Sequence, residues 1–110
     1  MVEVRIRKDS RERLSSFLAN GHAGWAESGE DVVCAAVSAI LQAAWLGLSE
    51  IAAIAVTATR EPGLLELTWP VGTRDDAGVR AIVGTAALSV ERIAAQYPDH
   101  VRVIHERGDG

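Results

Sequence analysis

Cysteine, aromatic residues and excess basic charge are all lacking or scarce in this chain of 110 residues. Its one cysteine, Cys34, excludes a disulfide framework and a zinc site built from several thiolates. Aromatic residues make up 5%, so small and branched aliphatic residues must fill the core. The net charge of −4 disfavours non-specific binding to nucleic acid, which requires a basic surface, and we expect no direct nucleic-acid partner. Phosphate-loop and dinucleotide glycine patterns are absent.

A targeting signal and a membrane span are also not expected. Residues 1–5 alternate between apolar and charged types, whereas a signal peptide has a continuous apolar centre. Residues 32–48 are mostly apolar, but the segment is short and carries Ser38 and Gln42, which favours a buried helix over a membrane span. We therefore expect a cytoplasmic protein that does not bind a membrane.

Hydrophobic periodicity predicts an alternation of strands and helices. Strands are predicted at 2–7 and 14–19, forming a hairpin, and again at 65–69 and 101–106. Helices are predicted from about residue 30 into the high forties, and from the possible caps Asp75 and Asp76 to Pro98. Residues 51–59 could extend the first helix or begin a strand. This order predicts one domain over residues 1–110 with a two-layer α+β fold, in which two main helices pack on a mixed or antiparallel sheet.

The first predicted helix has apolar residues on all of its sides. Val33, Val37 and Leu41 recur with Ile40, Ala44 and others around the helix axis. Such a helix must be covered on both sides, and a chain of this size can cover only one of them with its own sheet. We expect the same helix of a second copy to cover the other side, which predicts a homodimer.

Cys34 and His22 carry the types of side chain that make a cysteine nucleophile. Cys34 is expected about one turn inside the helix, where the helix-terminus field stabilises a thiolate by about 0.3–1 kcal/mol. That is too little to produce a good nucleophile at neutral pH, because the neighbouring Glu30 and Asp31 oppose it. An imidazole that takes the thiol proton is therefore needed, and the glycine-flanked His22 is the nearest candidate in the sequence.

Two further residues are predicted to share the helix face of Cys34. Asp31 precedes it by three residues and Ser38 follows it by four. Asp31 either orients the imidazole or caps the helix with Ser28, and Ser38 either donates a hydrogen bond into the site or bonds its own helix backbone. A metal site formed by His22, Asp31 and Cys34 is a third possibility, although the spacing matches no known metal motif.

The segments Gly21-His22-Ala23-Gly24 and Gly29-Glu30-Asp31-Val32-Val33-Cys34-Ala35-Ala36-Val37-Ser38 closely resemble the signature of the ribosomal-processing cysteine protease Prp family, the YsxB-like proteins. The resemblance is specific over residues 21–41 and rests elsewhere on length and element order. At Trp25 and Ser28 the sequence differs from the family, in which tyrosine is common at these positions. This difference bears on substrate preference.

The resemblance implies a homodimeric α+β cysteine endopeptidase that needs no cofactor or metal. Its substrate would be the precursor of large-subunit ribosomal protein L-twenty-seven, from which it removes an N-terminal extension. His22 and Cys34 match the catalytic pair, and Gly21, Asp31 and Ser38 match other motif positions. Because glycines bracket the loop at 23–29, we also expect that loop to be displaced until substrate binds.

Two other functions fit the same residues. The first is a non-catalytic dimeric module that binds a ribosomal protein during assembly. The second is a thiol redox sensor, which lacks a second cysteine to resolve an oxidised Cys34. The rate at which Cys34 is alkylated at neutral pH distinguishes an activated thiol from an ordinary one.

Overall fold

The computed structural model describes residues 1–21 and 28–108, without the side chains of residues 28–31. Its elements, in chain order, are β1 (Val2–Lys8), β2 (Leu14–Asn20), α1 (Ser28–Leu46), a π-helical turn (Gly47–Ile51), β3 (Thr57–Glu61), β4 (Leu64–Thr68), a 3₁₀ turn (Val71–Thr73), α2 (Ala77–Gln96) and β5 (Val101–Arg107).

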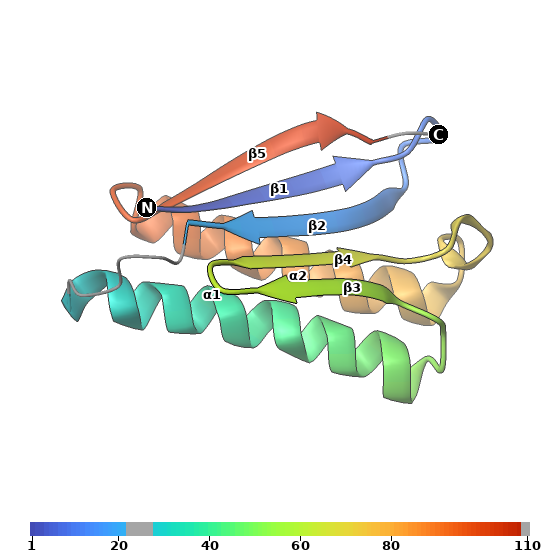
Figure 1. Ribbon diagram of the computed structural model, residues 1–110. Coiled ribbons are helices and arrows are strands. Elements are labelled where there is room, and N and C mark those ends of the chain that lie inside the picture. Colours follow the sequence, from blue (N-terminus) through green and yellow to red (C-terminus); the bar gives the residue numbers. More distant parts are fainter. Residues whose placement is uncertain (22–27, 109–110) are drawn as a thin grey trace.

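The five strands form one mixed sheet in the order β3-β4-β2-β1-β5. The pairs β1/β2, β2/β4 and β3/β4 are antiparallel, whereas β1 and β5 are parallel because α2 returns the chain to the starting end of the sheet. Figure 1 shows α1 and α2 side by side on the same side of the sheet, and none of the described helices lies on the other face. The predicted two-layer α+β fold with two main helices is therefore confirmed.

The start of α1 and the segment after it differ from the sequence prediction. The helix begins at Ser28, two residues earlier than expected, so Ser28 is already helical. The side chains of Ser28 and Asp31, predicted to form a cap, lie outside the described part. The π-helical turn ends at Ile51, and a strand begins at Thr57. In the segment 51–59, which was predicted either to extend the helix or to begin a strand, the first residue is therefore helical and the last three are in a strand. At α2, Asp76 caps the helix as expected and accepts a hydrogen bond from the Val79 amide.

The core lies between one face of the sheet and the inner faces of both helices. It contains Val33, Val37 and Leu41 of α1, Val79, Val83 and Val90 of α2, Val2, Val4, Ile6, Phe17 and Leu67 of the strands, and Trp69 directly after β4. The indole N–H of Trp69 donates a hydrogen bond to the Leu14 carbonyl at 2.9 Å, and its ring contacts Phe17 edge-on. A polar atom of the largest core side chain is thereby satisfied, as burial requires.

The opposite face of α1 is apolar and exposed. Val32 and Leu46 are 71% and 58% exposed, and Ala35, Ala39 and Ala43 lie between them at helical spacing. The segment Val32–Ile51 is long and apolar enough to cross a membrane by length and composition, and 33% of that window is buried. Its inner face belongs to the core described above, as in the core helix of a globular domain.

The turn between β1 and β2 is anchored by a buried carboxylate. Asp9 is fully buried. Its oxygens accept hydrogen bonds from the amides of Arg11 and Arg13, from Arg13 Nε and from Arg74 Nη1, at 2.9–3.1 Å. Burial alone would raise the pKa of Asp9, but the two amides and the two guanidinium groups outweigh it and lower the pKa to about 2.

Acid should therefore destabilise this fold between about pH 4 and pH 2. The unfolded chain binds a proton at the ordinary carboxyl pKa of 3.8, whereas folded Asp9 binds one only near 2. The stabilisation is complete above pH 4 and is lost as the pH falls through this window. The urea concentration at the unfolding midpoint should fall as the pH falls through this window. Asp9→Asn should lower that midpoint at pH 7 and make it depend less on pH below 4.

The exposed Asp99 offers a matched control, since Asp99→Asn removes the same charge without a buried partner. The urea midpoint of Asp9→Asn should still fall somewhat at acid pH, because a hydrogen bond from Arg7 lowers the pKa of Glu106 as well. An Asp9→Asn protein with the same midpoint as the parent at pH 7 would contradict this account of the turn.

Candidate active site

Cys34 lies deeper in α1 and deeper in the core than expected. It is six residues after Ser28, the first residue of the helix, and not one turn inside it. The field of a helix terminus falls off within the first turn, so it stabilises a thiolate at this position less than predicted. Cys34 is 4% exposed. Its reaction with a peptide therefore requires local rearrangement or approach from the groove beside it.

That groove runs along α1 and has a volume of about 730 Å³. We call it the Ser38 groove. Ala35, Ser38, Ala39 and Gln42 form its α1 wall, and the end of β3, the Pro62–Gly63 turn and the start of β4 form the other wall. Ala35 follows Cys34 directly and Ser38 lies one helical turn after it, so the groove begins at the residue next to Cys34, which does not itself line it.

Ser38 is the predicted site residue that the structure places in the groove. Its side chain is half-buried on the groove wall. Among the described residues, the hydroxyl has no hydrogen-bond partner, so the expected alternative of a bond to its own helix backbone is not observed. Ser89, on α2, does make such a bond, to the Thr85 carbonyl at 2.7 Å. The Ser38 hydroxyl is thus available to a peptide in the groove.

Gly21 connects β2 to the other wall of the groove. Its amide donates a hydrogen bond to the Gly63 carbonyl at 3.2 Å. Its φ is +96°, a conformation that favours glycine, and a Cβ added there would collide with the backbone carbonyl oxygen of Met1. The residue before His22 is therefore tied to the Gly63 end of the Ser38 groove, at a position where a side chain would collide with Met1.

The other predicted site residues cannot be placed. His22, Trp25 and the loop expected to move lie outside the described residues, apart from the helical backbone of residues 28 and 29. Asp31 is helical, on the turn of α1 before Cys34, and its side chain is not described. Within the described ranges, no three histidine, cysteine, aspartate or glutamate side chains are arranged to bind a metal.

Three groove residues were missed by the sequence reasoning, namely Gln42, Arg60 and Gly63. Gln42 is half-buried and Arg60 is exposed, so both can contact a bound chain. The sequence Pro62-Gly63 is typical of a turn, but nothing in the sequence shows that the end of this hairpin packs beside α1. The register of β3 and β4 against the helix decides this.

Comparison with known proteins gives consistent matches. The model of the family described as cysteine protease Prp matches residues 1–102. The ribosomal processing cysteine protease Prp of Bacillus subtilis is 30% identical over 113 residues, which cover 94% of this chain and 96% of that protein.

Two crystal structures share the fold. SMU.848 from Streptococcus mutans superimposes with a TM-score of 0.88 at 23% identity, covering 98% of this chain and 96% of its own. The ribosomal processing protease Prp from S. aureus, in complex with a substrate peptide, gives a TM-score of 0.81 at 21% identity, with coverage of 96% and 99%.

Proposed function

Because the chain belongs to the Prp family of ribosomal processing cysteine proteases, we propose that it removes an N-terminal extension from the precursor of ribosomal protein L-twenty-seven, with Cys34 and His22 as its catalytic pair. It acts as a single protease domain over residues 1–110, in the cytoplasm and as a homodimer. The reaction needs no metal or organic cofactor.

The observation that carries this proposal is the Ser38 groove. One wall is α1 immediately after Cys34, and the other is tied to Gly21, the residue before His22. One groove therefore lies beside two segments that are separate in the sequence. One segment bears the expected nucleophile, and the other leads to the expected base. A substrate peptide occupies the related S. aureus protease, and a peptide in this groove would lie beside Cys34.

The proposed reaction proceeds through a thioester. His22 takes the proton of the Cys34 thiol, and the thiolate attacks the scissile carbonyl carbon. The carbon–nitrogen bond breaks as His22 returns the proton to the leaving amine, which leaves the acyl group on sulfur. His22 then deprotonates a water molecule, whose oxygen attacks the thioester and releases the acyl product and the thiol.

The supporting residues have separate roles in this proposal. Asp31 orients the imidazole of His22 and stabilises its protonated form, as the acid does in a catalytic triad. Ser38 donates its available hydroxyl to the substrate backbone. Gly21 positions the chain that leads to His22. They are positioning residues, and their loss should slow the reaction less than loss of Cys34 or His22.

The lining of the groove suits an apolar peptide. Ala35 and Ala39 leave room along α1, and Leu64 and Leu65 provide apolar contacts on the other wall. This matches an extension that ends in a hydrophobic, aromatic-rich stretch before a small residue. Polar Gln42 and the charged Arg60 contact the backbone or flanking side chains of such a peptide.

The burial of Cys34 favours one rival function, a non-catalytic module that binds a ribosomal protein without cleaving it. A buried cysteine is usually an inert core residue. In our proposal, substrate binding rearranges the segment before α1 and gives the sulfur access to the scissile bond. A redox sensor is less well supported, since oxidation also requires an accessible sulfur.

Alkylation of Cys34 by iodoacetamide separates these functions. With the precursor peptide bound, an imidazole-activated thiol should react at pH 7 at least about tenfold faster than free cysteine, because the thiolate is the reacting form. His22→Ala should remove this acceleration, whereas His100→Gln, which changes a histidine in the turn before β5, should not. Equal rates in the parent and His22→Ala proteins would support the binding module instead.

The homodimer is supported by the exposed apolar face of α1. Val32, Ala35, Ala39, Ala43 and Leu46 form one stripe on the side of the helix opposite the core. The alanines permit close approach of a second helix, and the larger residues at the two ends add apolar area. Because Ala35 and Ala39 also line the Ser38 groove, the second copy would border the substrate site.

Leu46→Glu should convert the dimer to a monomer at micromolar concentration, because it places a charge in a buried apolar interface. Val71→Glu is the matched control, since Val71 is 54% exposed in the 3₁₀ turn, outside the stripe. Sedimentation equilibrium measures both masses. A monomeric parent protein, or dissociation by Val71→Glu to the same extent, would contradict this interface.

A further inference from the structure

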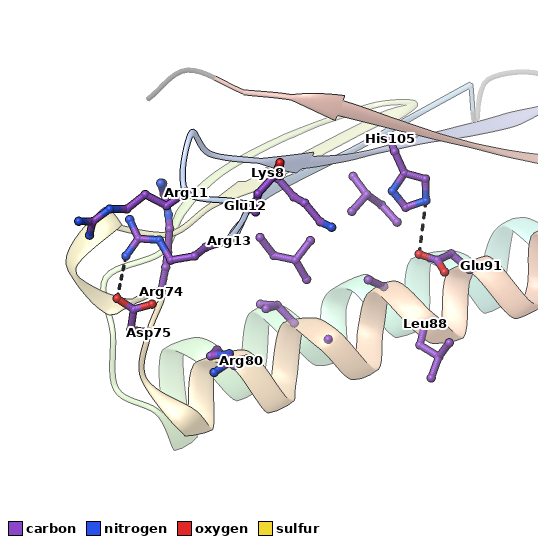
Figure 2. A pocket seen from close by; sticks show the side chains of 15 residues that line it. Lys8, Arg11, Glu12, Arg13, Arg74, Asp75, Arg80, Leu88, Glu91 and His105 are labelled. Atoms are coloured by element: carbon purple, nitrogen blue, oxygen red, sulfur yellow. Dashed lines mark hydrogen bonds and ion pairs between the residues drawn. The ribbon is translucent and has the colours of Figure 1, made fainter.

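A second cavity lies between the sheet and α2, at the end of the molecule where the turn of the β1/β2 hairpin approaches the start of α2. It has a volume of about 590 Å³, within the range of small-molecule sites, and shares no residue with the Ser38 groove. We call it the basic cavity. Figure 2 shows its walls, with Lys8 on the sheet side, Arg80 on α2, and Arg11, Arg13 and Arg74 near the turn.

Two of these arginines are neutralised and fixed in place. Arg13 bonds to the buried Asp9 and, at 2.9 Å, to Asp75, and Arg74 bonds to Asp9 and to the Trp69 carbonyl. Their side chains are only 15% and 10% exposed. They form a rigid wall of the cavity, because moving either one would remove one of the two guanidinium groups that bind the buried Asp9 carboxylate.

The other three cations have no acidic partner among the described residues. Within the described ranges, Lys8, Arg11 and Arg80 form no ion pair. They come from β1, from the following turn and from α2, so three separate elements contribute them to the lining of the cavity. In Figure 2 the ammonium of Lys8 extends into the space between the sheet and α2, and Arg11 stands at the rim.

The remaining acids of the lining do not balance these charges. Glu12 bonds to Arg107 at 2.6 Å, and Glu91 contacts His105 at 3.5 Å toward the middle of α2. Asp75 is already bonded to Arg13. The end of the cavity nearest the turn therefore carries an excess of positive charge, although the chain as a whole is acidic.

Gly84 leaves open space on the α2 wall of this cavity. A Cβ built there meets no atom within 4 Å, so any small side chain would fit. Glycine is a poor helix former, and packing does not require it at this position. Next to Gly84, the buried side chains Ile6, Val83 and Ala87 form an apolar floor.

From these observations we propose that the basic cavity binds a diphosphate group. Three unpaired cations from three elements match an anion with several charges and many acceptor oxygens better than a single carboxylate, which one arginine would satisfy. The floor beside Gly84 accommodates an organic group attached to the diphosphate. This site is independent of the peptidase reaction.

Calorimetric titration of the full chain with inorganic pyrophosphate and with ADP, in a metal-free buffer of low ionic strength, tests the proposal. Each probe should bind saturably, with one site per chain. Tighter binding of ADP would assign the site to organic diphosphates that use the apolar floor, and equal binding would assign it to inorganic diphosphate. Absence of saturable binding of both probes would overturn the proposal.

Two variants and one matched control locate the site. Lys8→Gln combined with Arg80→Gln should weaken binding at least about tenfold, because two charge-assisted contacts are lost. Gly84→Leu should weaken it comparably by filling the cavity, and its thermal unfolding would show that the fold is retained. Arg92→Gln combined with Arg102→Gln removes the same charge from exposed positions outside the cavity and should change affinity less than twofold. An effect of this control equal to that of the first pair, or unchanged binding by Gly84→Leu, would overturn the proposal.

Discussion

Cys34→Ala should abolish cleavage of a peptide that spans the extension of the ribosomal-protein precursor. The sulfur supplies the electron pair that forms the acyl intermediate, and no other described group borders the Ser38 groove with a comparable nucleophile. Loss of a nucleophile of this kind lowers kcat by about 10⁴-fold or more. His22→Ala should have a similar effect, because one imidazole accepts and returns the proton in both halves of the reaction. Cleavage is measured by mass spectrometry of the two products.

Both variants must keep the fold and the dimer for the result to be informative. Cys34→Ala replaces a buried side chain with a smaller apolar one, so its cost in stability should be small and visible as a shift in the melting temperature. His100→Gln serves as the histidine control and should cleave at the parental rate. Normal turnover by folded Cys34→Ala protein would exclude a thioester mechanism.

The second large effect, on the stability of the fold, is expected when a single methyl group is added at Gly21. Gly21→Ala should lower the free energy of unfolding by about 2 kcal/mol or more, because alanine at positive φ costs about 1–2 kcal/mol and the Cβ also collides with the Met1 carbonyl. Relief of this collision requires movement of either the first residues of β1 or the end of β2. The bond from Gly21 to Gly63 would then break, and cleavage should fall with stability.

Replacement of glycine with alanine at position 84 should increase the stability of the fold instead of lowering it. Gly84→Ala meets no atom within 4 Å in the interior of α2 and should raise the free energy of unfolding by about 0.5–1 kcal/mol. Urea titrations of the two variants therefore form a matched pair. A Gly21→Ala protein as stable as the parent would mean that the end of β2 is not fixed as described.

Much of the fold follows from local patterns. The alternation of Val2, Val4 and Ile6 with charged residues places β1 correctly, and Asp76 begins α2 as a capping residue should. The start of α1 was placed two residues too late, because the predicted capping pair was taken as its boundary. Residues 51–59 remained ambiguous because the helix ends in a π-helical turn, which has no periodicity of its own to recognise.

The candidate site was only partly predictable. The motif predicted His22 and Cys34 as the catalytic pair, which stays a prediction. Spacing along the helix pointed to Ser38, because i and i+4 share a face in every α-helix, and the structure places Ser38 in the groove. Gln42, Arg60 and the Gly63 carbonyl gave no signal, since they join the groove only when β3 and β4 pack beside α1. The burial of Cys34 could not be read from the sequence, because it depends on which face of the helix the sheet covers.

Sequence alone determined the elements, the family motif and the residue types available for chemistry, because periodicity and spacing act within a few residues of one another. Only the tertiary structure decided that Cys34 is buried, that Gly21 is bonded to the wall of its groove, and that Lys8, Arg11 and Arg80 line one cavity. These are consequences of the strand order β3-β4-β2-β1-β5, which pairs segments far apart in the chain, and local preferences carry no information about such pairings.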